Sequence, residues 1–239
     1  MSVILLRHTR LAGAEGLCYG RTDVALAGSF ADEVAVIRAG LAGVRFGAVW
    51  SSPAARCQRL AVALIGEWHG RPARGVEDHG RAAHATPIPD HGRDAHATPI
   101  SDHGRDAHAT SDSGVPTDAR LQELNFGAWE NCTWDSFRSP ESEAWALDSW
   151  SLAPPGGESG AQLWARVAAV RGEILGTLAT GSSGADGASV LVVTHAGVIR
   201  AWLGLERGLG WAEAMCLPVP HGSLTVIDPC GRQATGDKF

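Results

Sequence analysis

The sequence has no long run of apolar residues. None of its stretches approaches the roughly 18 residues that a membrane-spanning helix needs. The first eight residues are too few, and become charged too soon, to be a secretory signal, so we expect them to form a first strand. Positive charge is also scarce. The formal net charge of −6 argues against a nonspecific grip on nucleic acid through the phosphate backbone. We therefore expect a cytoplasmic protein with neither a membrane nor a nucleic acid as its partner.

Cysteine is sparse and irregularly placed. No Cys-x-x-Cys pair occurs, and the number of cysteines is odd: Cys18, Cys57, Cys132, Cys216 and Cys230. This pattern fits reduced thiols better than a disulfide framework or a zinc site. The composition, with 44% hydrophobic and 19% charged residues, is that of a globular protein with a sizeable core.

A repeat with a period of 12 residues interrupts the chain. Residues 78–86 return, almost unchanged, as residues 90–98 and 102–110. Two interpretations stay open: a metal-binding tract, or a duplicated repeat tolerated in a surface loop, which we favour because the unit brings almost no apolar side chains. We set residues 72–114 aside as an insert in a single domain spanning residues 1–239. Six of the ten histidines lie in it: His79, His84, His91, His96, His103 and His108.

The rest of the chain alternates predicted strands and helices. Short apolar runs predict strands at residues 3–6, 48–50, 190–194 and 224–227. Apolar residues spaced by three and four predict helices within residues 30–41, 57–68 and 163–178. Ser159 and Gln162 form a capping box before the third helix. This alternation predicts an α/β fold, a three-layer sandwich with a mostly parallel sheet and helices on both faces.

Residues 125–155 stand outside this alternation. They contain four tryptophans, Trp129, Trp134, Trp145 and Trp150, and we expect a helical excursion there. Packing within this excursion is the simpler role for the tryptophans, although stacking on an aromatic base is a natural alternative.

Two histidines directly follow predicted buried strands. His8 comes after residues 3–6 and Arg7, and His195 comes after residues 190–194. In an open α/β sheet, ligands bind at the carboxyl ends of the strands, so we expect both rings in one crevice. Arg56, in the first turn of the helix that follows the second strand, could reach the same place.

Two histidines and two arginines suit a phosphate dianion. Guanidinium groups match phosphate oxygens bidentately and stay charged at any working pH. The sequence has no P-loop and no carboxylate cluster for Mg²⁺, so the nucleophile could be an imidazole. The leaving oxygen needs a proton donor, and Glu123, in an otherwise apolar stretch, is one candidate. Spacing alone cannot bring it to the site.

Taken together, these motifs resemble those of the histidine phosphatase (phosphoglycerate mutase-like) superfamily, in family order over nearly all of the chain outside the insert. The segments that carry the resemblance are Leu6-Arg7-His8, Cys18-Tyr19-Gly20-Arg21-Thr22-Asp23, Ser51-Ser52-Pro53-Ala54-Ala55-Arg56, Leu121-Gln122-Glu123-Leu124-Asn125-Phe126-Gly127-Ala128-Trp129-Glu130, Gly156-Gly157-Glu158-Ser159 and Thr194-His195-Ala196-Gly197.

The resemblance implies a role for each matching residue. His8 would be the nucleophile and become phosphohistidine, while Glu123 would be the general acid and then the base for water. The residues that would bind the phosphoryl group or line the pocket are Arg7, Arg56, His195, Tyr19, Gly20 and Ala196. One position departs from the family pattern, because Thr9 replaces the usual glycine after Arg-His. This replacement adds a Cβ and a hydroxyl next to His8 but removes no catalytic group.

Within the superfamily, the Cys18–Asp23 segment most resembles α-ribazole phosphatases of cobalamin nucleotide-loop assembly. We therefore expect an enzyme that hydrolyses a small phosphate ester without metal or cofactor. A phosphatase or mutase of sugar or glycerate phosphates is the nearest alternative, and a non-catalytic protein that binds through the histidine-rich insert is the alternative from another class. Glu158 and His221 are weaker candidates for the pocket rim. The oligomeric state is left open.

Overall fold

A computed structural model describes residues 2–66, 114–179 and 188–228 of the chain. The chain divides into two compact units, Met1–Ala73 with Ser113–Phe239, and Arg74–Asp112. The second unit lies outside the described residues, and so do Cys230 and all of the predicted insert except Gly114. The four described cysteines, Cys18, Cys57, Cys132 and Cys216, are free thiols.

The centre of the first unit is a four-stranded sheet. Its strands are β1 (Val3–Arg7), β3 (Phe46–Ser51), β5 (Ser189–Thr194) and β6 (Leu224–Ile227), in the order β3-β5-β1-β6. β3, β5 and β1 are parallel, and β6 runs antiparallel to β1. All four strands lie where the apolar runs predicted them. β5 is buried at every residue, as expected for a strand covered on both faces.

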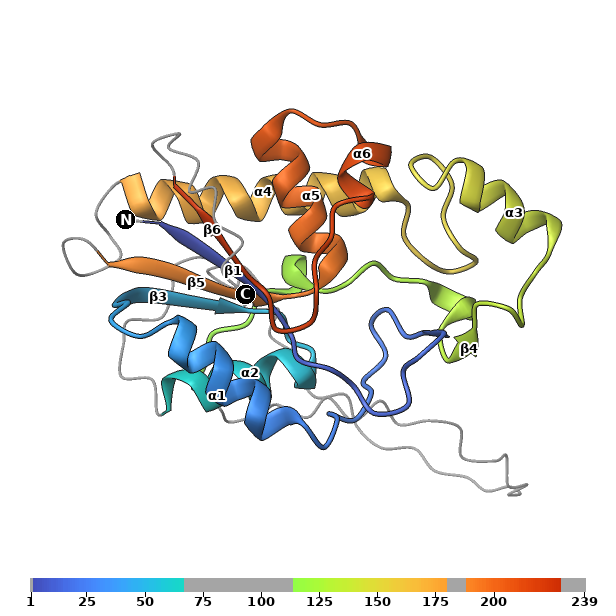
Figure 1. The fold of residues 1–239 in the computed structure, drawn as a ribbon. Coiled ribbons are helices and arrows are strands. Elements are labelled where there is room, and N and C mark those ends of the chain that lie inside the picture. Colours follow the sequence, from blue (N-terminus) through green and yellow to red (C-terminus); the bar gives the residue numbers. More distant parts are fainter. Residues whose placement is uncertain (1, 67–113, 180–187, 229–239) are drawn as a thin grey trace, which may run out of the picture. The chain divides into compact units, whose positions relative to one another are not determined.

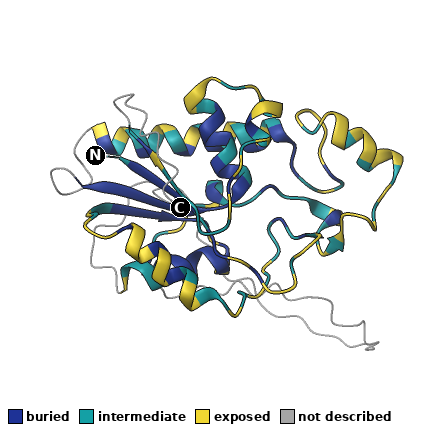
Figure 2. Cartoon of the chain, viewed as in Figure 1, coloured by how far each residue is buried: buried dark blue, intermediate teal, exposed yellow. Residues whose placement is uncertain are grey.

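Helices cover both faces of this sheet (Figure 1). α1 (Phe30–Gly40) and α2 (Ala55–Ile65) pack on one face, and α4 (Gly160–Ala179) and α5 (Ala196–Arg207) pack on the other. The short α6 (Trp211–Met215) packs against α5. Each long helix turns its apolar residues inward, so Figure 2 shows buried residues along the sheet and the inner sides of the helices. The three-layer α/β prediction is confirmed.

Local signals in the sequence position α4. Ser159 Oγ accepts from Gln162 N at 3.3 Å, and Gln162 Oε1 accepts from Ser159 N at 2.8 Å. This is the predicted capping box, and it satisfies two backbone donors that the helix cannot pair itself. α4, which begins at this box, packs against α5 and the 3-10 turn η1 (Ala119–Leu121).

The predicted helical excursion at residues 125–155 is mostly wrong. The segment has only one α-helix, α3 (Pro140–Leu147), together with the 3-10 turn η2 (Gly127–Trp129) and the strand β4 (Cys132–Thr133), which pairs with β2 (Leu17–Cys18). Ring-to-ring packing, rather than a helical repeat, organises the segment. Trp129 stacks on Phe137 at 5.1 Å between centroids and meets Trp145 edge-on at 5.4 Å.

Within the three described ranges, no helix combines the length and the apolar character needed to cross a membrane.

Candidate active site

The parallel strands bring their carboxyl ends to one edge of the sheet, and the predicted residues meet there. His8 follows β1, His195 follows β5, and Ser52 follows β3. His8 N donates to Thr194 O at 3.0 Å, which ties the first two strand ends together. The His8 and His195 rings lie 5.3 Å apart between centroids, with their planes inclined by 65°. The two histidines that the sequence placed in one crevice are therefore neighbours.

His8 is held in one tautomer by the backbone carbonyl of the next residue. The side chain is buried, and Nδ1 lies 2.8 Å from the carbonyl oxygen of Thr9. A carbonyl oxygen can only accept, so Nδ1 carries the proton and Nε2 of the neutral ring keeps its lone pair. Burial, and then the positive charge of Arg56, hold the pKa of His8 well below its ordinary 6.5. The ring is thus neutral and able to act as a nucleophile at neutral pH.

Thr9, the departure from the family pattern, does not need a positive φ. Among the described residues, Asn131 alone combines a side chain with a positive φ, so Thr9 has an ordinary backbone conformation. A glycine is therefore not required at this position. The Thr9 residue is fully buried, and its Oγ1 has no hydrogen-bond partner within the described part of the chain.

Arg56 connects the histidine pair to the Tyr19–Thr22 segment. Its guanidinium is buried and donates to Gly20 O at 2.6 Å and to Thr22 O at 2.7 Å. It also lies over the Tyr19 ring, 5.3 Å from the centroid, in a cation–π contact. The predicted pocket residues Tyr19 and Gly20 are therefore joined directly to Arg56.

His195 is fully buried at the N-terminus of α5. Arg56 Nη2 lies 3.3 Å from its Nδ1, and Ser52 Oγ lies 2.8 Å from its Nε2. Because a guanidinium only donates, Nδ1 accepts and Nε2 carries the proton toward Ser52. Burial, with Arg56 as the next cause, keeps the pKa of His195 well below 6.5. Ser52 lies in a segment that carries the family resemblance, but its contact with His195 was not predicted.

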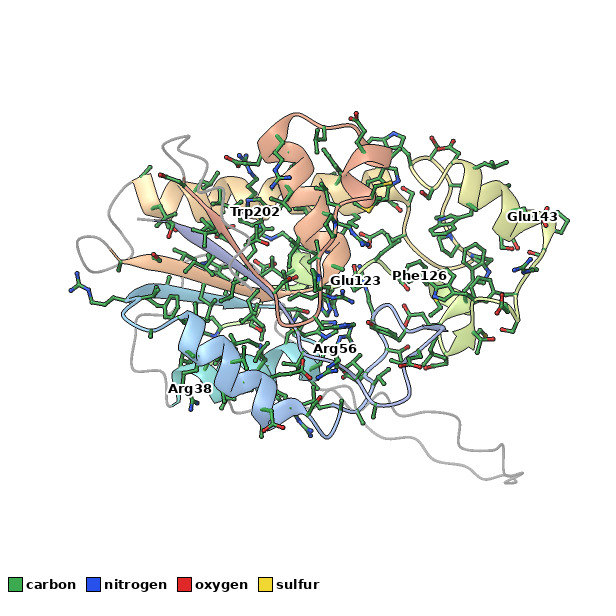
Figure 3. All side chains as sticks on the ribbon, in the orientation of Figure 1. Arg38, Arg56, Glu123, Phe126, Glu143 and Trp202 are labelled. Atoms are coloured by element: carbon green, nitrogen blue, oxygen red, sulfur yellow. The ribbon has the colours of Figure 1, made fainter. Side chains whose placement is uncertain are left out.

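Glu123 is brought to the same end of the sheet by the start of α5. Its Oε2 accepts from Gly197 N at 3.2 Å, and its Oε1 accepts from Leu124 N at 2.9 Å. Figure 3 shows Glu123 and Arg56 close to the ends of the strands. A free amide at a helix N-terminus is a favourable partner for a carboxylate. Tertiary structure thus supplies the placement that sequence spacing alone left undetermined.

Glu158 supports Glu123 rather than lining the site. The Glu158 carboxylate pairs with Arg166 at 2.7 Å and with Arg21 at 3.2 Å. Both arginines also donate to the backbone carbonyl of Glu123, Arg166 at 3.1 Å and Arg21 at 3.3 Å. Arg166 was not predicted, because its acceptors are backbone oxygens that only the fold brings within reach.

Glu130 holds the Gly20–Thr22 segment in place through hydrogen bonds to its backbone. Its carboxylate accepts from the backbone amides of Arg21 at 2.9 Å and Thr22 at 2.8 Å. Gly20 has φ +38°, and a Cβ there would lie 2.2 Å from Glu130 Oε1 and 2.8 Å from Leu124 O. Only glycine fits this turn, so the glycine of the Cys-Tyr-Gly-Arg motif has a steric explanation.

Arg7 points from the end of β1 into the loop before β6. Its Nη1 donates to Val219 O at 2.5 Å, and its Nη2 lies 2.9 Å from His221 Nε2. The His221 ring is 5.3 Å from the His8 ring between centroids. His221, a weak candidate from sequence, is therefore adjacent to the central histidine.

The site gathers imidazoles and guanidiniums. In the described ranges, no group of three or more His, Cys, Asp or Glu side chains is arranged to hold a metal ion. The six histidines of the repeat lie outside those ranges. The described side chains suit a tetrahedral oxyanion, with cationic donors from Arg7 and Arg56, a neutral imidazole in His8 and the carboxylate of Glu123 at the same end of the sheet.

Comparison with solved structures supports the same fold. The alpha-ribazole phosphatase from Shigella flexneri aligns with a TM-score of 0.65 and 19% identity, covering 95% of this chain and 90% of that one. The mycobacterial glucosyl-3-phosphoglycerate phosphatase Rv2419c aligns with a TM-score of 0.63 and 20% identity, covering 94% of this chain and 88% of that one.

Two sequence comparisons each cover about half of the chain. The bifunctional protein Rv2228c of Mycobacterium tuberculosis is 34% identical over 116 residues, which is 48% of this chain and 30% of the length of that relative. Residues 104–238 match the family model of the histidine phosphatase superfamily, branch 1. That stretch includes Glu123 and His195. Strand β5 within it pairs with β1, which His8 follows, and with β3, which precedes the helix of Arg56. The chain belongs to the histidine phosphatase superfamily.

Proposed function

We propose that this protein is a phosphomonoesterase that works through a phosphohistidine at His8. The observation that carries the proposal is the hydrogen bond from His8 Nδ1 to Thr9 O, because it leaves the lone pair on Nε2. Burial first, and then the neighbouring Arg56 and Arg7, lower the pKa of His8, and the two arginines are also the cations that a phosphate dianion needs. Family membership supports the same chemistry.

The reaction has two transfers. Nε2 of His8 forms a bond to phosphorus as the bond from phosphorus to the ester oxygen breaks, and Glu123 gives that oxygen a proton. Water then attacks the phosphohistidine while the Glu123 carboxylate takes its proton, which releases inorganic phosphate and restores His8. Arg7, Arg56 and His195 bind the phosphoryl oxygens, and Tyr19, Gly20 and Ala196 line the pocket. No metal or cofactor takes part.

A labelling experiment tests the nucleophile. Brief incubation with a ³²P-labelled phosphate ester should leave label on the protein that is lost in acid and kept in base, as a phosphoramidate is. His8→Ala should neither take up label nor turn over p-nitrophenyl phosphate, and EDTA should leave wild-type turnover unchanged. Label that survives acid, or label on His8→Ala, would contradict the proposal.

For the substrate we propose α-ribazole 5′-phosphate. Support comes from the Cys18–Asp23 resemblance and from the solved relative that is an alpha-ribazole phosphatase. A flat aromatic base suits the Tyr19 ring and the aromatic segment at residues 128–155, where Trp134 and Trp150 are partly exposed. A second anionic group finds little there, because Arg138 is the one basic residue and pairs with Asp135, among further acidic residues.

The rival substrates are glycerate and sugar phosphates, since another solved relative is a glucosyl-3-phosphoglycerate phosphatase. Comparing kcat/KM for α-ribazole 5′-phosphate and 3-phosphoglycerate on one preparation decides between them. We expect the ribazole ester to be preferred. A tenfold preference for a glycerate or sugar phosphate, about 1.4 kcal/mol in the transition state, would refute the assignment and leave the phosphohistidine step intact.

A further inference from the structure

The loop before β6 holds Arg7 through both side chain and backbone. Val219 O accepts a hydrogen bond from Arg7 Nη1, and His221 Nε2 accepts one from Arg7 Nη2. Gly222 N also approaches the carbonyl oxygens of Arg7 and His8, at 3.2 Å from each. Both terminal nitrogens of Arg7 are therefore fixed by this loop, next to the nucleophile.

The contact between Arg7 and His221 determines the tautomer of His221. A guanidinium has no acceptor atom, so His221 Nε2 must be the acceptor and Nδ1 must carry the ring proton. Burial first, and then Arg7, lower the pKa of His221 from 6.5 to about 4. The ring is thus neutral over the range in which a phosphatase would be assayed.

One nitrogen of Arg7 is left without a protein partner. Arg7 Nε is buried and has no hydrogen bond within the described part of the chain. With Nη1 and Nη2 anchored, the guanidinium plane is set and its Nε–H has a fixed direction. A buried donor of this kind costs free energy unless a ligand pairs with it, and a phosphoryl oxygen would do so.

We propose that His221 is a positioning residue: its neutral Nε2, together with Val219 O, orients Arg7 so that the guanidinium meets a phosphoryl oxygen beside His8. The inference rests on the proposed phosphatase function and adds a residue to it. In this proposal His221 acts through Arg7. It acts as an acceptor that keeps a cation in place, a role that needs the uncharged ring.

The proposal has a consequence for pH dependence. Protonation of His221 would put an N–H donor and a positive charge against the Arg7 guanidinium, so one of the two side chains would have to move. The charged and titratable groups around His221 are Arg7 and His8 at the end of β1, Arg10 beyond it, and Glu33 on α1. Glu33 opposes the shift, while Arg7 and Arg10 reinforce it.

Two variants distinguish the hydrogen-bond acceptor of His221 from the bulk of its ring. In His221→Gln, the amide oxygen can take the place of Nε2 and does not titrate, whereas His221→Leu has similar bulk and no acceptor. Calorimetric titration with inorganic phosphate at pH 7 should give a Kd about tenfold higher for Leu, and near wild type for Gln. Turnover should follow, with KM raised more than kcat is lowered. Between pH 7 and 4, wild type should lose phosphate affinity more steeply than His221→Gln.

A spectroscopic measurement tests the proposal without turnover. The ring ¹⁵N shifts of His221 in wild type should show a protonated Nδ1 and a bare Nε2 at pH 7. A protonated Nε2, or a folded Leu variant that binds phosphate as tightly as wild type, would overturn the proposal. If phosphate binding depends on His221 but His8 takes up no label, the positioning role stands and the phosphatase function fails.

Discussion

At the level of single side chains, the site sets neutral imidazoles among guanidinium cations. Burial is the first cause of the low pKa of His8, His195 and His221, and a nearby arginine is the second. Each ring is therefore neutral near pH 7, and the lone pairs of His195 and His221 accept from Arg56 and Arg7. The arginines keep their charge, so the crevice has an excess of positive charge that an incoming phosphate dianion would neutralise.

These lowered pKa values predict a loss of stability in acid. Above pH 6.5, His8 and His195 are neutral in both the folded and the unfolded chain, so their contribution to stability is complete. Below pH 6.5 the unfolded chain binds protons that the folded chain does not, and the free energy of unfolding falls by up to about 1.4 kcal/mol per pH unit for each ring. Urea denaturation at pH 7.5, 6.5 and 5.5 measures this slope. A His195→Asn variant should show a shallower slope, and equal slopes in the two proteins would contradict the assignment.

The leaving-group dependence of the rate tests Glu123. A proton donor matters most when the leaving oxygen is strongly basic, so Glu123→Gln should slow alkyl phosphates by about 10²–10⁴-fold and p-nitrophenyl phosphate much less. Steady-state rates on the two substrates measure the difference. Equal losses on both would show that Glu123 is not the donor.

At the level of helices and strands, the start of α5 serves both proposed roles, phosphate binding by His195 and proton transfer by Glu123. It has His195 as its N-cap and presents the amide of Gly197 to Glu123. A Cβ on Gly197 would lie 2.3 Å from Glu123 Oε1. The contact is with the far end of a side chain, so the fold can absorb it by moving the carboxylate.

Gly197→Ala should therefore lower activity without lowering stability. We expect turnover of alkyl phosphates to fall by about 10–100-fold, because small displacements of a catalytic group are costly. The free energy of unfolding should be unchanged or higher by about 0.5–1 kcal/mol, because alanine is the better helix former. Gly172→Ala in α4 is the matched control, since a Cβ there meets nothing within 4 Å. It should gain stability and keep full activity, and a Gly197→Ala variant that behaves identically would refute the role of this contact.

The sequence was sufficient to predict the parts that follow a pattern. Continuous apolar runs located the four strands, and strand ends located His8 and His195. The aromatic segment was mispredicted because Trp129, Phe137 and Trp145 pack by ring geometry, which has no sequence period. Arg166 could not be found for a different reason: its acceptors are carbonyl oxygens of residues 120, 122 and 123, which no side-chain pattern reveals.

At the scale of the whole molecule, every described residue of the site belongs to the first unit, and the insert follows α2 in the sequence. The chain returns directly to the sheet, where Ser51 N donates to Pro116 O at 3.2 Å and Asp118 N donates to Ser51 O at 2.9 Å. Both anchor points lie outside the repeat.

Replacing residues 72–114 by a short Gly/Ser loop should thus preserve the enzyme. We expect activity within a few-fold of wild type and an unchanged or higher Tm, because Ile88 and Ile100 are the only large aliphatic residues in the repeats. A scrambled insert of the same length and composition is the control for loop length. Collapse of the fold, or loss of an activity that depends on added Zn²⁺, would favour the metal-binding interpretation of the histidines.

The place of β1 in the sheet has a consequence for biosynthesis. β1 is made first, yet its two neighbours, β5 and β6, are made last. At about 5–20 residues per second, ribosomes would need roughly 9–37 s to go from the end of β1 to the end of β5. Until β5 has been made, the apolar strand Val3–Arg7 lacks both of its neighbours in the sheet. The strand therefore stays unpaired for most of translation, and a polypeptide truncated before β5 would carry His8 without the neighbouring strand that brings it beside His195.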